Sequence, residues 1–234
     1  MKRKSLLFAC LLLLALPFYA AQVDTVMVQS PSMNKEVQVV VVTPDVALGK
    51  KAVACPVVYL LHGFGGNAKT WINTKPELPQ IADEKGIIFV CPDGKNTWYW
   101  DSPKNKDVRY ETFISSELIK YIDGHYKTVA APRGRAITGL SMGGHGALWN
   151  AIRHTDVFGA AGSMSGGVDI TLFPDKWEIK NINGLGINNL GINGATASSY
   201  MNNILSKISF QSLGKYIFIM FGTNEIIYEN NPLI

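Results

Sequence analysis

The sequence predicts an α/β fold built on a mostly parallel sheet. Short and nearly continuous apolar runs recur along the chain and end in or near glycine-containing loops, which is typical of strands buried on both faces of a parallel sheet. Helical segments lie between these runs, and this alternation favours one α/β unit with helices on both faces of the sheet. The runs are PVVYLLHG (56–63), GIIFVCPDG (86–94), RAITGLS (135–141), FGAAGSMSG (158–166) and KYIFIMFGT (215–223).

Two earlier segments predict an antiparallel pair of strands. Residues 24–30 and 36–44 have the composition of strands, and a polar turn at 31–35 joins them. We therefore expect a mostly parallel sheet with an N-terminal antiparallel strand pair.

The segments between the parallel strands predict helices and one long irregular segment. Residues 111–126 repeat apolar side chains at helical spacing, and the segment GGHGALWNAIRH begins two residues after Ser141. Residues 169–205 are rich in asparagine and glycine, and we expect them to cross the carboxyl edge of the sheet as a lid or as a plain surface loop.

The first 21 residues predict a secretory signal peptide, which leaves a domain over 22–234. A basic start precedes an apolar stretch at 6–16 that is too short to span a bilayer, and Ala20 and Ala21 suit a cleavage site. We therefore expect a secreted or periplasmic protein without stable membrane association. Because LFAC faintly resembles a lipoprotein cleavage site, a lipid anchor through Cys10 is the alternative.

The charge of the chain belongs mostly to this leader. The whole sequence has a net charge of +4, but removing the leader's three basic residues from 22 leaves 19, against 18 acidic residues. A nearly neutral domain has no global attraction to nucleic acid or to an anionic membrane. Cys55 and Cys91 fall at opposite ends of predicted parallel strands, so we expect two buried thiols rather than a disulfide.

The segment Gly139-Leu140-Ser141-Met142-Gly143 is the principal candidate for chemistry. It fits the G-x-S-x-G pattern between a strand and a helix, where a tight turn strains the serine backbone and exposes its hydroxyl above the sheet. We therefore predict that Ser141 is a nucleophile. The alternative is an ordinary strand exit made of small residues.

A second glycine-rich loop predicts an oxyanion hole. The sequence LLHGFGG ends an earlier apolar strand, and attack on an ester carbonyl requires two preplaced donors for the developing negative charge. We expect these donors to be the backbone amides of Phe64 and Met142. The loop lacks the features of a phosphate or dinucleotide cradle, so no cofactor is expected. His62 is expected to order the loop.

These motifs together resemble a known family. YLLHGFGG, FVCPDG, YETFISSELIKYID, GLSMGGHGALWNAIRH and FGTNEIIYE resemble, in order and spacing, the esterase D family of α/β-hydrolases. That family includes S-formylglutathione hydrolases, feruloyl and acetyl-xylan esterases, and mycolyltransferases. The likeness runs from about residue 28 to the end of the chain. It implies an α/β-hydrolase fold and a Ser, Asp, His triad that hydrolyses carboxylic esters or thioesters through an acyl-enzyme.

The resemblance also places the triad acid and leaves the base unassigned. The position of the family's acid holds Glu225 in this chain, and no histidine follows it. The family carries its catalytic histidine on a later loop that precedes a closing helix. We therefore expect a domain that is incomplete at its C-terminus, lacks the final helix and turns over poorly. Among the other histidines, His145 is expected to be a packing residue of the helix after Ser141. His125 and His154 are expected at or beyond helix ends, where they face solvent or cap carbonyls.

The loop KNTWYWDSP suggests a substrate site. Trp98 and Trp100 follow a strand at its carboxyl end, where ligands of α/β proteins gather, and they either stack on a sugar or phenolic acyl group or pack the loop. An exported esterase of this kind suggests an acylated polysaccharide or a short-chain ester as substrate. A non-catalytic protein that binds carbohydrate or another protein is the rival class. The histidines and acids show no metal-ligand spacing, so no metal is expected. The oligomeric state stays open.

Overall fold

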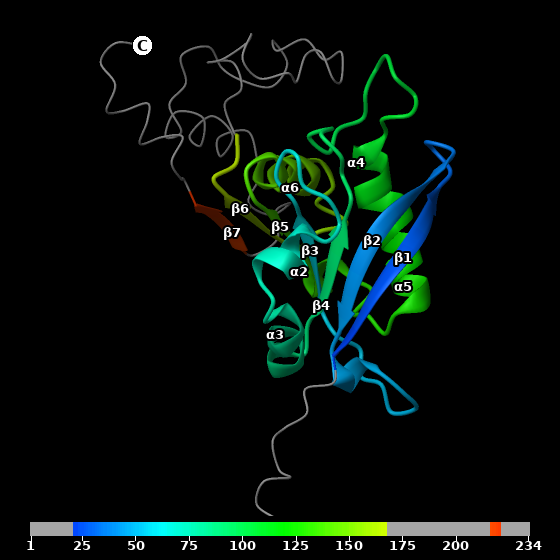
Figure 1. The fold of residues 1–234 in the computed structure, drawn as a ribbon, viewed down its shortest axis with the longest axis vertical. Helices are drawn as coiled ribbons and strands as arrows, with labels where there is room; N and C mark the ends of the chain where they lie inside the picture. Colours follow the sequence, from blue (N-terminus) through cyan, green and yellow to red (C-terminus); the bar gives the residue numbers. More distant parts are fainter. Residues whose placement is uncertain (1–20, 168–215, 221–234) are drawn as a thin grey trace, which may run out of the picture.

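A seven-stranded mixed sheet forms the centre of the molecule, in the order β1-β2-β4-β3-β5-β6-β7 (Figure 1). The computed structural model describes residues 21–167 and the backbone of 216–220. Strands β1 and β2 pair antiparallel, β2 pairs antiparallel with β4, and the remaining neighbours are parallel, so the predicted fold class is confirmed. The strands are β1 (Gln22–Ser30), β2 (Lys35–Thr43), β3 (Val57–Leu61), β4 (Ile88–Pro92), β5 (Arg135–Gly139), β6 (Ala160–Met164) and β7 (Tyr216–Met220).

Helices cover both faces of this sheet. Helices α2 (Thr70–Thr74) and α3 (Leu78–Lys85) pack on one face, and α5 (Leu118–His125) and α6 (Met142–Arg153) pack on the other. The segment predicted as one helix over 111–126 has three parts, because the π-helical turn η3 (Phe113–Glu117) lies between α4 (Tyr110–Thr112) and α5. Two short 3₁₀ turns, η2 (Asp45–Ala47) and η4 (Pro132–Gly134), complete the described elements.

The apolar runs bury residues on alternate sides of the sheet. In β2, Val39 and Val41 join the core beneath α5 and α6, whereas Val40 and Val42 join the core beneath α2 and α3. Successive side chains of a strand point to opposite faces, so a strand with helices above and below it needs apolar residues throughout. This requirement explains why the runs lack the polar alternation of a half-exposed strand.

Several sequence expectations fall on residues that the structure leaves undescribed. These are the signal peptide with Cys10, the irregular segment at 169–205, the acid Glu225 and the absence of a closing helix, all of which lie outside the described residues. Cys55 and Cys91 lie inside them as buried free thiols, as predicted. None of the described helices is both long and apolar enough to cross a bilayer.

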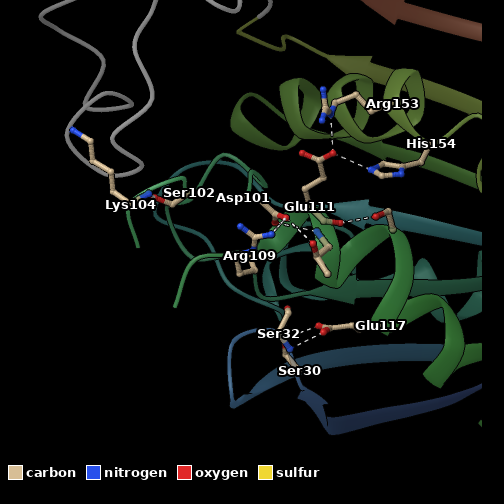
Figure 2. A network of polar contacts seen from close by, with 12 residues as sticks. Ser30, Ser32, Asp101, Ser102, Lys104, Arg109, Glu111, Glu117, Arg153 and His154 are labelled. Carbon is tan, nitrogen blue, oxygen red and sulfur yellow. Dashed lines mark hydrogen bonds and ion pairs between the residues drawn. The ribbon is translucent and has the colours of Figure 1, made fainter. Parts of the chain in front are cut away.

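Two buried or half-buried carboxylates fix the segment from α4 to α5 against its neighbours (Figure 2). Four of their hydrogen bonds measure between 2.6 and 2.9 Å and reach residues more than 40 positions away in sequence. Charge-assisted bonds of this kind are stronger than neutral ones. The carboxylates are Glu111, with partners Arg153 and His154 at the end of α6, and Glu117, with partners Ser30 and the backbone of Ser32 beside β1.

A largely buried ion pair ties the start of β5 to α5. The guanidinium of Arg135, at the start of β5, donates a hydrogen bond to the carboxylate of Asp123. The same carboxylate accepts a hydrogen bond of 2.7 Å from the Thr128 hydroxyl. An ionic group of this kind is costly to bury without its partner, so the pair constrains how β5 sits on α5.

His145 in α6 is enclosed by tryptophans. Its ring lies 5.3 Å from the Trp98 ring, 5.0 Å from the Trp100 ring and 6.2 Å from the Trp149 ring, measured between centroids. Its Nδ1–H donates to the carbonyl of Gly167 at 2.7 Å, and within the described residues its Nε2 has no partner. Burial, partly opposed by the bond to Gly167, lowers the pKa of His145 to about 4. The expectation that the His145 side chain has a packing role is confirmed.

Replacing Asp123 with asparagine should destabilise the fold. The substitution leaves the buried Arg135 guanidinium without a counter-charge, and the free energy of unfolding should fall by about 3 kcal/mol. Urea titration measures this loss. The matched control is Lys75→Gln, which breaks the exposed Lys75–Glu77 pair and should leave stability nearly unchanged. Equal losses in the two variants would contradict a special role for the buried pair.

His145 should make stability depend on pH in the mildly acidic range. The unfolded chain binds a proton at this ring near its ordinary pKa of 6.5, whereas the folded chain excludes it until about pH 4. The stabilising contribution is therefore complete above pH 6.5 and is lost as the pH falls toward 4, at up to about 1.4 kcal/mol per pH unit. Urea titrations at pH 7.5, 6 and 5 should show a shallower dependence in His145→Gln, while the exposed control His125→Gln keeps the wild-type slope. Identical slopes in all three proteins would refute the assignment.

Candidate active site

Ser141 occupies a strained turn between β5 and α6. Its backbone angles are φ 54° and ψ −114°, an unusual region for a residue other than glycine, and its side chain is exposed. Its amide donates to the carbonyl of Met164 at 2.8 Å, and its own carbonyl accepts the His145 amide at 3.0 Å as α6 begins. The predicted sharp turn with an exposed hydroxyl is therefore present at the carboxyl end of β5.

The two glycines of the motif permit this turn. A Cβ on Gly139 would lie 2.7 Å from the carbonyl oxygen of Leu61, and a Cβ on Gly143 would lie 2.7 Å from that of His62. Neither separation is compatible with a side chain, so the beginning of α6 can approach the end of β3 only if these positions lack one. The motif thus turns the chain and also brings the end of β5 and the beginning of α6 close to the end of β3.

The loop that follows β3 lies directly beside Ser141. A Cβ built on Gly63 would be 3.7 Å from the Cβ of Ser141, which places the 63–66 loop against the serine. The backbone amides of Phe64 and Met142 have no hydrogen-bond acceptor within the described part of the chain. The Met142 side chain is buried, whereas the Phe64 side chain is 52% exposed.

His62 orders this loop instead of serving as a base. Its Nδ1–H donates to the Gly63 carbonyl at 2.7 Å, and its Nε2 accepts the Gly94 amide at 2.9 Å. Both ring nitrogens are therefore engaged in loop contacts, as predicted. Sequence reasoning missed the partners of His62 in the PDG segment after β4, although that segment is one of the motifs that carry the family resemblance.

Asp93 is the charged member of the PDG segment. Burial acts to raise the pKa of the Asp93 carboxyl, but the neighbouring His62 ring and the ammonium and amide of Lys95 outweigh it and lower the pKa to about 2. The Lys95 ammonium lies 2.6 Å from the carboxylate. Asp93 is thus ionised, and its bonds to Lys95 fix the loop after β4 at the edge of the sheet where Ser141 lies.

The chain contains four histidines, all of them in the described part, and none of their imidazole rings is hydrogen-bonded to the Ser141 hydroxyl. His62 and His145 have the contacts given above. His125 bonds the Tyr121 carbonyl at 2.8 Å, as expected at a helix end, whereas His154 pairs with the Glu111 carboxylate instead of facing solvent or capping a carbonyl. The expected acid, Glu225, lies outside the described residues.

The two tryptophans proposed for substrate stacking lie in the interior. Trp98 is 5% exposed and Trp100 is 0% exposed, and both rings contact His145. A ring enclosed in this way presents no free face to a sugar or phenolic group. Of the two alternatives for Trp98 and Trp100, stacking on a substrate therefore does not fit the structure, whereas packing of the loop does. The sequence could not distinguish these outcomes, because both use large aromatic residues at the same strand end. Apolar side chains that are exposed at this edge belong instead to Phe64 and Leu140.

The described residues contain no group of three or more histidine, cysteine or acidic side chains placed to hold a metal ion. The arrangement that does exist is an exposed hydroxyl beside two unpaired backbone donors. Such donors are suited to an oxygen that becomes negatively charged during attack on a carbonyl.

Comparisons with known proteins identify the family of the chain. Residues 30–209 match the family described as "Putative esterase". The chain is 35% identical to esterase Rv1288 of Mycobacterium tuberculosis (strain ATCC 25618 / H37Rv) over 114 residues, which cover 47% of this chain and 25% of that protein. It is also 35% identical to the MPT51/MPB51 antigen of Mycobacterium bovis (strain ATCC BAA-935 / AF2122/97) over 150 residues, which cover 63% of this chain and 46% of the antigen.

A solved structure of a ferulic acid esterase superposes with a TM-score of 0.62 at 26% identity, covering 83% of this chain and 74% of that one. The match with the two mycobacterial relatives spans less than half the length of either of them. From the family match over most of its length, and from a fold shared with esterases, we conclude that the chain belongs to the Putative esterase family of α/β-hydrolases.

Proposed function

We propose that this chain is a carboxylic-ester hydrolase that acts through an acyl-enzyme on Ser141. The observation that carries the proposal is the position of the exposed Ser141 hydroxyl on a strained turn, against a loop with a free backbone amide. The kinship with proteins named esterase and ferulic acid esterase supports the same reaction class.

The reaction follows from the geometry of this edge. The Ser141 Oγ attacks the carbonyl carbon of the ester, and the carbonyl oxygen becomes an oxyanion that accepts hydrogen bonds from the Phe64 and Met142 amides. When the tetrahedral intermediate collapses, the bond to the alcohol oxygen breaks, and the alcohol leaves with the proton that the Ser141 hydroxyl lost on attack. Water then attacks the acyl-serine, which releases the carboxylic acid and restores the hydroxyl.

The start of α6 contributes to the same stabilisation. The helix runs over 12 residues from Met142, and its first amides have no intrahelical acceptor. Their aligned dipoles favour negative charge at this end of the helix. Since the oxyanion forms beside Met142, the helix lowers the energy of the transition state more than that of the neutral ester.

Proton transfer is the step for which the described residues supply no group. Serine is a weak nucleophile until a base takes its proton, and all four histidines of the chain have other contacts. We assign Glu225 the role of the triad acid, and we propose that turnover of this chain is slow without a histidine to link that acid to Ser141. The same observation favours a second candidate, a non-catalytic member of the fold that binds carbohydrate or protein.

The substrate that we propose is an acylated polysaccharide or a short-chain ester. The ferulic acid esterase likeness supports an ester of this kind, and the apolar side chains of Phe64 and Leu140 are exposed beside the serine, at 52% and 42%. The leader-like first 21 residues support a secreted or periplasmic site of action, with lipid attachment through Cys10 as the alternative.

A fluorophosphonate probe should label this protein on Ser141. Attack on the phosphorus uses the same hydroxyl and the same oxyanion donors as attack on an ester, whereas a pure binding protein needs neither. Intact-mass and peptide mass spectrometry should place one adduct on Ser141 and none on Ser141→Ala. The control Ser32→Ala, in the exposed turn between β1 and β2, should label like the wild type. Absence of any adduct on the wild type would exclude the hydrolase proposal.

Hydrolysis of p-nitrophenyl acetate should be feeble and dependent on Ser141. The oxyanion donors and the serine by themselves retain part of the catalytic effect when the base is missing, so a rate above that of the buffer is expected. Spectrophotometric release of p-nitrophenol measures the rate in the wild type and in Ser141→Ala. Vigorous hydrolysis that Ser141→Ala abolishes would show that another base operates, and the proposal of slow turnover would then be wrong.

A further inference from the structure

The loop after β4 holds the oxyanion loop at three points. The Gly94 amide donates to Nε2 of His62 at 2.9 Å, and the Tyr99 hydroxyl donates to the His62 carbonyl at 3.1 Å. The third bond lies further along the oxyanion loop, where Oδ1 of Asn96 accepts the Gly65 amide at 2.7 Å. The first two bonds fix the end of β3, and only the third reaches the peptide next to the Phe64 donor.

That peptide is the one on which the shape of the turn depends. The Gly66 amide donates to the Gly63 carbonyl at 3.0 Å, and Gly65 has a φ of 77°, which together identify a type II turn with Phe64 and Gly65 at its centre. In a type I turn the central peptide is rotated by about half a revolution, which would carry the Gly65 amide away from Asn96. The glycine at position 65 favours the type II form, because that form needs a positive φ there, and the bond from the Gly65 amide to Asn96 stabilises the same orientation of the central peptide.

Asn96 is itself held in place by a constrained backbone. Lys95, Trp98 and Tyr99 all have positive φ values, of 49°, 58° and 61°, which side-chain-bearing residues seldom adopt. Such a conformation persists only where its surroundings enforce it. Here the Tyr99 ring is wholly buried and packs against Gly146 of α6, where a Cβ would overlap the ring. The Asn96 oxygen is therefore a fixed acceptor on the body of the protein.

We propose that Asn96 is a positioning residue of the oxyanion hole. By accepting the Gly65 amide, Asn96 keeps the central peptide of the turn in one orientation and the Phe64 amide beside Ser141, so that the donor does not reorganise when the oxyanion forms. Preorganisation of this kind is the main source of oxyanion stabilisation. The inference rests on the proposed function, since it assigns a role within that site.

The test compares covalent labelling in variants of the full chain. An alkyl fluorophosphonate is titrated against wild type, Asn96→Ala and Asn105→Ala, and the labelling rate is resolved into a maximal rate constant and an apparent probe affinity. Asn105 is the matched control, because its Oδ1 also accepts a loop amide, that of Asp107 at 2.9 Å, away from the oxyanion loop. Asn96→Ala should lower the maximal rate constant about tenfold or more with little change in probe affinity or melting temperature. Asn105→Ala should match the wild type.

Amide hydrogen exchange supplies a readout that needs no reactivity. The Gly65 amide should exchange faster in Asn96→Ala, whereas Asn96→Asp retains an acceptor oxygen and should keep that amide protected. A wild-type labelling rate or wild-type Gly65 exchange in Asn96→Ala would overturn the inference while Ser141 labelling still upheld the hydrolase. A fall in probe affinity and melting temperature together with the rate would also overturn it, since general loosening of the loop would then explain the effect. If the wild type is not labelled at all, the proposed function fails, and this inference fails with it.

Discussion

The close approach of α6 to the end of β3 is the constraint on which the site depends. Gly143 lies so near the carbonyls of Leu61 and His62 that no side chain fits there, and Gly139 lies as close to Leu61. Because α6 must begin at this distance from β3, Ser141, midway between the two glycines, takes a positive φ and projects its hydroxyl outward. The same approach brings the loop after β3 to Ser141, so one packing contact produces both the exposed hydroxyl and its neighbouring donors.

The strain of this turn is offset by the rigid body beneath it. The Ser141 amide bonds to the end of β6, β5 is tied to α5 by the buried pair of Arg135 and Asp123, and α6 is held at its far end by Glu111. Strained backbone persists where surrounding contacts over-determine it. The tryptophans around His145 belong to the same support, since they fill the space between α6 and the loop after β4. Their burial is thus part of how the site is positioned.

Much of the fold could be predicted from the sequence, and for a simple physical reason. Strands covered on both faces are largely apolar, so the short runs at 56–63, 86–94 and 135–141 were distinguishable from half-exposed strands and from the longer helical segments. The antiparallel pair was equally readable from its composition and polar turn. The π-helical interruption at η3 was not, because the apolar spacing over 111–126 fits an unbroken helix as well.

By itself the sequence determined the order of the strands, the helical segments at 111–126 and after Ser141, the placement of Ser141 at a strand-to-helix turn, and the glycines that this turn needs. Each of these depends on neighbours along the chain. Only the tertiary structure decided the burial of Trp98 and Trp100, the pairing of His154 with Glu111, and the contact between Asn96 and Gly65. Those outcomes join residues that are 31 and 43 positions apart, or depend on what packs above a loop. Local pattern carries no information about such partners, since the same residue types serve equally well at a surface or in an interior.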